Sequence, residues 1–216
     1  MRMVKYIIKK IIYGTVRFFI WVYHRTQCFK LIEIIKEEDR RFQMGKLFNE
    51  FASIGKNTNI PTPHRILNPQ YMFIGDNFST LYNFRIEAWD DFRGKPHSPK
   101  ITIDDNVAFN TDCHIACIDE IKIGNNVLAG SRVYITDHFH GYTDGSDINI
   151  PPTFRALTSK GSVNIGDNVL IGEGAAIMPG VTVGKNCIIG ANAVVTRSMP
   201  ANCIVAGVPA KVIRRL

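Results

Sequence analysis

A six-residue period in the last third of the sequence limits what this chain can fold into. An aliphatic residue recurs at every sixth position, at Ile165, Ile171, Ile177, Val183, Ile189 and Val195. An α-helix repeats every 3.6 residues or so, and would place these side chains on different faces. Glycine follows four of them, at Gly166, Gly172, Gly184 and Gly190. The period excludes a helix here and predicts short strands separated by turns.

The same period recurs upstream in groups of three hexapeptides. The repeated positions are Ile54, Ile60 and Ile66; Ile74, Thr80 and Ile86; Ile103, Phe109 and Ile115; and Ile123, Ala129 and Ile135. If three hexapeptides complete one triangular coil, stacked coils place these residues in ladders along a shared interior. The Gly, Asn and Asp residues that follow them favour turns. We predict a parallel β-solenoid over residues 54–203, preceded by helices in residues 1–53 and followed by a C-terminal segment, 204–216.

Extra residues occur only after the third hexapeptide of a group. They separate Ile66 from Ile74, Ile86 from Ile103, Ile115 from Ile123, and Ile135 from Ile165. All insertions should therefore leave the solenoid at one corner. The longest, 137–162, contains two histidines and a Pro-Pro pair, and long loops on a regular scaffold are usually functional. This corner is the predicted site.

Charge and cysteine content exclude some classes of protein. The net charge is +7, but the first thirty residues hold seven basic and no acidic residues, and the remainder balances at 19 of each. A nucleic-acid binder presents a basic stripe on its folded body, so no nucleic-acid partner is expected. The five cysteines lack C-x-x-C or zinc-type spacing, which indicates reduced thiols in a cytoplasmic protein: Cys28, Cys113, Cys117, Cys187 and Cys203.

Several motifs resemble the hexapeptide-repeat acyltransferases. They are Asp137-His138-Phe139-His140-Gly141, Pro151-Pro152, Arg155, Ser159-Lys160-Gly161, Ile165-Gly166-Asp167-Asn168-Val169, and the run from Ile204 to Ile213 that contains Ala-Gly-Val-Pro-Ala. The chain is most similar to the maltose and galactoside acetyltransferase branch, and within it to O-acetyltransferases of bacterial surface-polysaccharide synthesis. Over residues 54–216, the resemblance implies a left-handed β-helix, a homotrimer, acetyl-coenzyme A as acyl donor, no metal, and a sugar or glycan hydroxyl as acceptor.

Acetyl transfer to a hydroxyl needs a base, and neutral imidazole serves near pH 7. The resemblance assigns that role to His138. His140 is the competitor, because residues two apart share one face of an extended segment; we assign it to substrate binding. Asn110 follows Phe109, where an asparagine of the family contacts the acceptor hydroxyl, although a simple turn residue is an alternative.

The resemblance also places coenzyme A along the last coils and the C-terminal segment. The implied contacts are Gly172, Ala191, Thr196, Arg197, Lys211 and Arg214. Charge alone would not identify this site, because exposed cations are ordinarily part of the solvated surface.

Residues 4–23 predict a basic amphipathic helix. Its apolar face would hold Val4, Ile7, Ile8, Ile11, Ile12, Phe18, Phe19 and Val22. Two interpretations remain: peripheral docking on the anionic inner face of the membrane, or packing on protein. Arg17 and Arg25 interrupt the apolar stretch, so we expect no membrane span. A second helix, about residues 31–51, is expected to cap the first coil.

Three alternatives to sugar O-acetylation are considered. N-acetylation of an amino sugar would use the same scaffold, base and donor. A zinc enzyme like the β-helix carbonic anhydrases would use His114, His138 and His140 as ligands, but those enzymes do not usually carry the terminal Ala-Gly-Val-Pro-Ala motif. A non-catalytic scaffold is disfavoured by the intact histidine motif.

Overall fold

The computed structural model describes residues 2–26 and 29–216, so Cys28 lies outside the described residues. The chain divides into two compact units, Met1–Gly45 and Lys46–Leu216. Helix α1 (Arg2–Thr26) is the helix expected at the N-terminus, and α2 (Phe29–Phe48) follows it in the sequence. Along α1, every side chain from Lys9 to Trp21 is exposed; side chains 2–8 are not among those described. In the described residues, no helix combines the length and apolarity needed to cross a bilayer.

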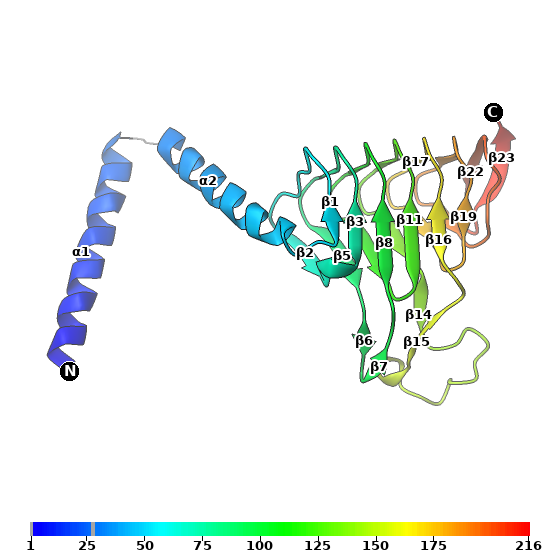
Figure 1. Ribbon diagram of the computed structural model, residues 1–216, viewed down its shortest axis with the longest axis horizontal. Helices are drawn as coiled ribbons and strands as arrows, with labels where there is room; N and C mark the ends of the chain where they lie inside the picture. The colour runs from blue at the N-terminus through cyan, green and yellow to red at the C-terminus, as the bar shows by residue number, and fades with distance from the viewer. Residues whose placement is uncertain (1, 27–28) are drawn as a thin grey trace. The chain divides into compact units, whose positions relative to one another are not determined.

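The second unit is the predicted left-handed parallel β-helix, and its described coils build three sheets (Figure 1). The first sheet contains β1 (Ser53–Ile54), β3 (Met72–Ile74), β8 (Lys100–Ile103), β11 (Glu120–Ile123), β16 (Val163–Ile165) and β19 (Thr182–Val183). The second contains β4 (Ser79–Thr80), β9 (Ala108–Phe109), β12 (Leu128–Ala129), β17 (Leu170–Ile171), β20 (Ile188–Ile189), β22 (Cys203–Ala206) and β23 (Lys211–Arg215). The third contains β2 (His64–Leu67), β5 (Phe84–Ala88), β10 (His114–Cys117), β13 (Tyr134–Thr136), β18 (Ala176–Ile177) and β21 (Val194–Val195).

The strand register follows the six-residue period. In the third sheet, Ile86 pairs with Ile115, Ile115 with Ile135, and Ile135 with Ile177. These side chains are at most 1% exposed and form one ladder of the core. Because neighbouring residues on a strand point to opposite faces, the residues flanking each ladder position point away from the core. The ladders therefore determine which side chains the outer face of the third sheet presents.

A column of asparagines stabilises the corner between the first and second sheets. Its seven members have positive φ, which asparagine tolerates better than most residues: Asn57, Asn77, Asn106, Asn126, Asn168, Asn186 and Asn202. The side-chain amide of each of the first six donates to the asparagine of the next coil, and Asn202 accepts the last of these bonds. The turn chemistry expected from Gly-Asp-Asn and Gly-Asn-Asn thus also links successive coils.

The insertions leave at the corner between the third and first sheets, as the spacing predicted. One forms the hairpin of β6 (Asp91–Phe92) and β7 (Lys95–Pro96). The longest forms the antiparallel pair β14 (His138–His140) and β15 (Leu157–Ser159). Both hairpins project from the same edge of the β-helix in Figure 1. Short 3-10 helices lie at η1 (Pro69–Tyr71) and η2 (Pro152–Phe154).

The segment that leads into the first coil makes a local aromatic contact and one backbone hydrogen bond to the coil. Phe51 is 9% exposed and packs edge-on against Phe48, at the end of α2. The backbone N–H of Ala52 donates to the carbonyl of Pro69. That the second helix caps the first coil stays a prediction.

Candidate active site

His138 starts β14 at the point where the chain leaves the third sheet. Its ring Nδ1 lies 2.9 Å from Oδ1 of Asp137 and 3.3 Å from Oγ of Thr136. His138 is 8% exposed, and the other two residues are at most 1% exposed. The ladder residue Ile135 anchors this segment to the core, so the scaffold fixes the backbone of all three.

The coil below holds the Asp137 carboxylate in place. It accepts hydrogen bonds from the backbone N–H groups of Ile118, at 3.0 and 3.1 Å, and Asp119, at 2.7 Å. The thiol of Cys117 adds a contact of 3.2 Å. Burial, then the charge of Asp137, raises the pKa of Cys117, so the thiol remains protonated and donates. Hydrogen bonds of this kind stabilise the charged form of a buried carboxylate.

This environment determines which ring nitrogen of His138 carries the proton. An ionised carboxylate accepts hydrogen bonds only, so Nδ1 of His138 carries the proton and donates to Asp137. The neutral ring then has an unprotonated Nε2, and no hydrogen bond within the described residues occupies that atom. Asp137 and His138 form a candidate catalytic pair, called the catalytic pair below, because they have the arrangement of a general base and the carboxylate that orients it.

His140 lies on the same face of β14, as the spacing predicted. Its ring packs edge-on against Phe92, with ring centroids 5.4 Å apart. Burial, then the charge of His138, lowers the pKa of His140, which favours its neutral form. No carboxylate among the described side chains hydrogen-bonds to it, whereas Asp137 orients His138. The geometry favours His138 as base.

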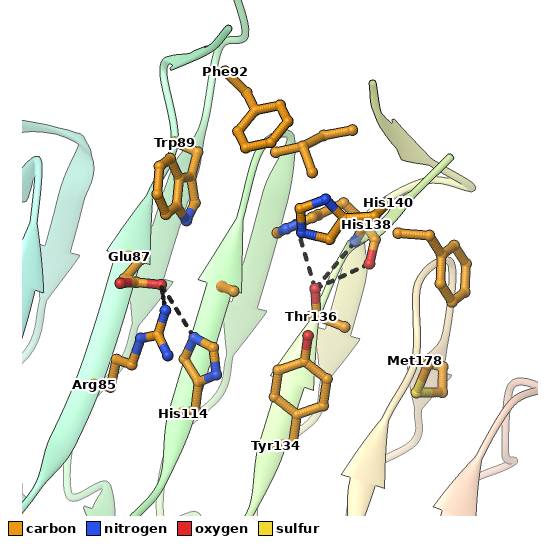
Figure 2. Close-up of a pocket in the computed structure, with 13 residues that line it drawn as sticks. Arg85, Glu87, Trp89, Phe92, His114, Tyr134, Thr136, His138, His140 and Met178 are labelled. Carbon is orange, nitrogen blue, oxygen red and sulfur yellow. Dashed lines mark hydrogen bonds and ion pairs between the residues drawn. The ribbon is translucent and has the colours of Figure 1, made fainter. Parts of the chain in front are cut away.

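A pocket of about 440 Å³ opens in front of these histidines (Figure 2). Its floor is the outer face of the third sheet, and its walls come from the two insertions. The lining residues are Arg85, Glu87, Trp89, Phe92, His114, Ala116, Tyr134, Thr136, His138, Phe139, His140, Leu157 and Met178. Its volume lies in the range of about 300–1,000 Å³ that is usual for small-molecule sites.

A buried carboxylate lies on the pocket floor. The side chain of Glu87 is 1% exposed and pairs with Arg65, with Arg85 at 2.8 Å and with the His114 ring at 3.2 Å. Burial by itself raises the pKa of Glu87, but the hydrogen bonds from His114, Arg85 and Arg65 outweigh it and hold the pKa at about 2. Glu87 is therefore ionised throughout the physiological pH range.

The structure does not bring every predicted site residue to this pocket. Asn110 precedes β10, whereas the catalytic pair contacts the residues after β10, so the two lie at opposite ends of that strand. A Cβ at Gly172 would stand 2.5 Å from the backbone nitrogen of Ala191, so these predicted coenzyme contacts stack at one turn. Thr196 and Arg197 follow β21, and Lys211 and Arg214 lie on β23; all four are exposed.

The proposed zinc ligands have other partners. His114 contacts Glu87, and His138 contacts Asp137. Within the part of the chain that the structure describes, no group of three or more His, Cys, Asp or Glu side chains is arranged to hold a metal ion.

Sequence reasoning did not assign a role to Asp137 or to the cluster of Arg85, Glu87 and His114. Asp137 was visible only as the residue before His138, and its backbone donors are 18 and 19 residues away. The clue to the cluster was the charge beside ladder positions: Arg85 and Glu87 flank Ile86, so both point outward.

Known proteins share this repeat and this fold. The pattern of the family described as bacterial transferase hexapeptide (six repeats) matches residues 162–197. The protein named "Putative lipopolysaccharide biosynthesis O-acetyl transferase WbbJ", from Escherichia coli K12, is 40% identical over 157 residues, which cover 71% of this chain and 76% of that protein. The galactoside O-acetyltransferase of Escherichia coli K12 is 29% identical over 77% of this chain and 64% of its own length.

Solved structures of acyltransferases also resemble this chain. A maltose O-acetyltransferase from Clostridium difficile 630 is 28% identical, with a TM-score of 0.55 over 90% of this chain and 87% of that one. A mutant of AntD, an N-acyltransferase from Bacillus cereus in complex with dTDP and coenzyme A, has a TM-score of 0.66 over 80% of this chain and 87% of that one. At 21% identity, this second likeness shows the fold alone.

Proposed function

Because the chain belongs to the hexapeptide-repeat acetyltransferases, we propose that it transfers an acetyl group from acetyl-coenzyme A to a sugar hydroxyl in the synthesis of a surface polysaccharide or lipopolysaccharide. The name of the Escherichia coli relative, which refers to lipopolysaccharide biosynthesis, supports that setting. The observation that carries the proposal is the catalytic pair at the pocket, with Nδ1 of His138 held 2.9 Å from Asp137.

The chemistry follows from the free Nε2 of His138. This atom accepts the proton of the acceptor hydroxyl as the hydroxyl oxygen bonds to the thioester carbonyl carbon. The carbon–sulfur bond then breaks, and the protonated ring returns the proton to the departing sulfur. Asp137 stabilises the positive charge that His138 carries between the two steps, because the pair is buried and the carboxylate is fixed by the backbone of Ile118 and Asp119.

The acyl donor would lie along the last coils. Gly172 and Ala191 stack at one turn, where a Cβ at Gly172 would collide with the Ala191 backbone, so this turn carries only small residues. Arg197, Lys211 and Arg214 are exposed cations suited to the phosphates of coenzyme A. We propose that these residues, with Thr196, hold the donor.

We also propose a homotrimer, the general state of this family. An apolar column on the outer face of the second sheet supports it: Leu128 pairs with Leu170, Leu170 with Ile188, and Ile188 with Ile204. Leu128 and Leu170 are 50% and 42% exposed in the single chain, and association would bury them. Since Asn110 lies at the far end of β10 from His138, it would reach an acceptor from a neighbouring subunit.

Helix α1 is proposed to contact the anionic inner face of the membrane through residues 4–23. Exposed Ile11, Ile12, Phe18 and Phe19 support this, together with the cations Lys9, Lys10 and Arg17. The protein should sediment with vesicles that contain anionic lipid, and Lys9→Glu/Lys10→Glu should weaken this binding; equal binding to neutral vesicles would contradict the proposal.

Free thiols at the four described cysteines, Cys113, Cys117, Cys187 and Cys203, fit a reducing compartment.

The test of the transferase function is acetyl-coenzyme A turnover with a panel of sugars, amino sugars and lipid-linked glycans, followed by free thiol release. The product should carry an acetyl ester, which mild alkali removes, with His138→Ala as the silent control. An alkali-stable acetamide on an amino sugar would instead identify an N-acetyltransferase. Absence of turnover with every acceptor would contradict the proposal.

A further inference from the structure

The end of the pocket away from the catalytic pair is built from charged groups that the chemistry above does not use. Figure 2 shows Arg85, Glu87 and His114 on one side of the pocket, and the histidines of β14 on the other. The three side chains come from adjacent strands β5 and β10, where Arg85 pairs with His114 in register. They therefore lie on a rigid sheet and not on a loop.

Glu87 contacts more positive charge than one carboxylate requires. One ionised Glu87 contacts two guanidinium groups, those of Arg65 and Arg85, and also the His114 ring. A single cation would neutralise the buried carboxylate. Counting Arg65, which lies outside the pocket lining, together with Arg85 against Glu87, these groups carry one net positive charge. Glu87 is also the sole carboxylate among the described residues that line the pocket.

Hydrogen-bonding capacity points in the same direction. Two Glu87 oxygens already accept from three groups, so Glu87 has little capacity left for a ligand. Arg85 has five N–H donors, of which Glu87 occupies few, and its side chain is 45% exposed at the pocket. The Tyr134 hydroxyl, on the neighbouring strand, is a further donor among the lining residues. Glu87 holds Arg85 in position, and Arg85 presents donors to whatever enters.

We propose that the Arg85–Glu87–His114 cluster is an anion-binding subsite, and that the acceptor sugar places a phosphate or carboxylate group there while its reacting hydroxyl lies at His138. Trp89 and Phe92, with ring centroids 6.2 Å apart, form an aromatic wall of the same pocket, and Phe92 contacts the His140 ring; a sugar ring would pack against this wall. The assignment of the anion to an acceptor rests on the proposed acetyl transfer; binding of the anion does not.

The sequence provides its own reporter for this subsite. It contains two tryptophans, Trp21 and Trp89. In a Trp21→Phe background, the fluorescence of Trp89 reports occupation of the pocket. Three probes with the same ring are titrated without acetyl-coenzyme A: glucose 1-phosphate, glucuronate and methyl glucoside. We expect at least one charged probe to bind about tenfold or more tightly than the neutral one. Which charged probe does so identifies the phosphate or the carboxylate as the group recognised.

Variants separate the cluster from general charge effects. Arg85→Gln should abolish the preference for the charged probe, and Arg85→Lys should keep part of it, because lysine retains the charge without the two-pronged geometry. Arg132→Gln is the matched control, since Arg132 pairs with Glu173 at another corner. Equal affinity for all three probes, or a preference that survives Arg85→Gln, would overturn the proposal. Because no acyl donor is present, this result is independent of whether acetyl transfer occurs.

Discussion

Replacing Asp137 with asparagine should inactivate the enzyme while leaving it folded. The amide has one oxygen and one NH2 group, and the two positions face different partners. The Ile118 N–H reaches both positions, at 3.0 Å from Oδ1 and 3.1 Å from Oδ2, and keeps an acceptor if Oδ2 stays an oxygen. Oδ2 also receives the Asp119 N–H at 2.7 Å and the Cys117 thiol at 3.2 Å, whereas Oδ1 faces Nδ1 of His138 at 2.9 Å. Placing the NH2 group against the buried donors would leave them unsatisfied, at about 1–3 kcal/mol each. The NH2 group should therefore face His138.

That orientation changes the His138 tautomer. Nδ1 must then accept a hydrogen bond, so the ring proton moves to Nε2, the atom that should act as base. General-base catalysis contributes about 10²–10⁴-fold, and the same carboxylate-to-amide exchange in a Ser-His-Asp triad costs about 10⁴-fold. We expect kcat for thiol release to fall by about 10²–10⁴-fold, and stability to fall by about 1–3 kcal/mol from the lost charge-assisted hydrogen bonds.

The assay is steady-state thiol release, run well below the Tm of each variant. Asp119→Asn is the matched control, because Asp119 is exposed and contributes only its backbone N–H to the Asp137 carboxylate. It should retain the kcat of the unmodified enzyme. A folded Asp137→Asn enzyme with kcat within about tenfold of the unmodified enzyme would refute the orienting role of Asp137.

Three further predictions concern stability and assembly. The pKa of Glu87 falls from 4.5 to about 2 on folding. The stabilisation that its charged form gives the folded state is therefore present above pH 4.5 and lost as pH falls toward 2. A shift of this size corresponds to roughly 3 kcal/mol of folding free energy, which solvent screening at the exposed Arg65 and Arg85 side chains reduces to about 1–2 kcal/mol. The unfolding free energies of the native protein and Glu87→Gln should converge at low pH, and a constant difference would contradict this. Ile135→Ala, at a fully buried ladder position, should cost about 2–5 kcal/mol in denaturant unfolding, whereas Ile148→Ala, at a position 72% exposed, should change little; equal effects would argue against the ladder as core. Leu170→Glu should dissociate the proposed trimer in light scattering, while Leu81→Glu, at a position 46% exposed outside the apolar column, should not; a trimeric Leu170→Glu protein would exclude this face as the interface.

The repeat predicted the fold in detail because its period determines the register. Ile86, Ile115 and Ile135 each occupy the third repeated position of a group of hexapeptides, and Ile115 pairs with the other two on neighbouring strands. The insertion corner was also predictable, since extra residues occur after one hexapeptide of each group. The shared face of His138 and His140 followed from strand geometry, and both line the pocket.

The site's electrostatics could not be predicted from the sequence in the same way. Glu87 and His114 are 27 residues apart, and they meet because an insertion of irregular length still returns the chain to the ladder. The backbone donors to Asp137 come from the coil below, and backbone N–H groups leave no signature in the residue types. Period and composition therefore predict positions on a face, while contacts between coils depend on the folded insertions.

The most direct test of the central claim compares His138→Ala with His140→Ala in acetyl-coenzyme A turnover. The two residues lie on one short strand at the same pocket, so each variant controls for the other. We predict that kcat falls by about 10²–10⁴-fold in His138→Ala, whereas His140→Ala keeps kcat and raises KM for the acceptor. Full activity in His138→Ala, or loss of kcat in His140→Ala alone, would show that His138 is not the general base of this enzyme.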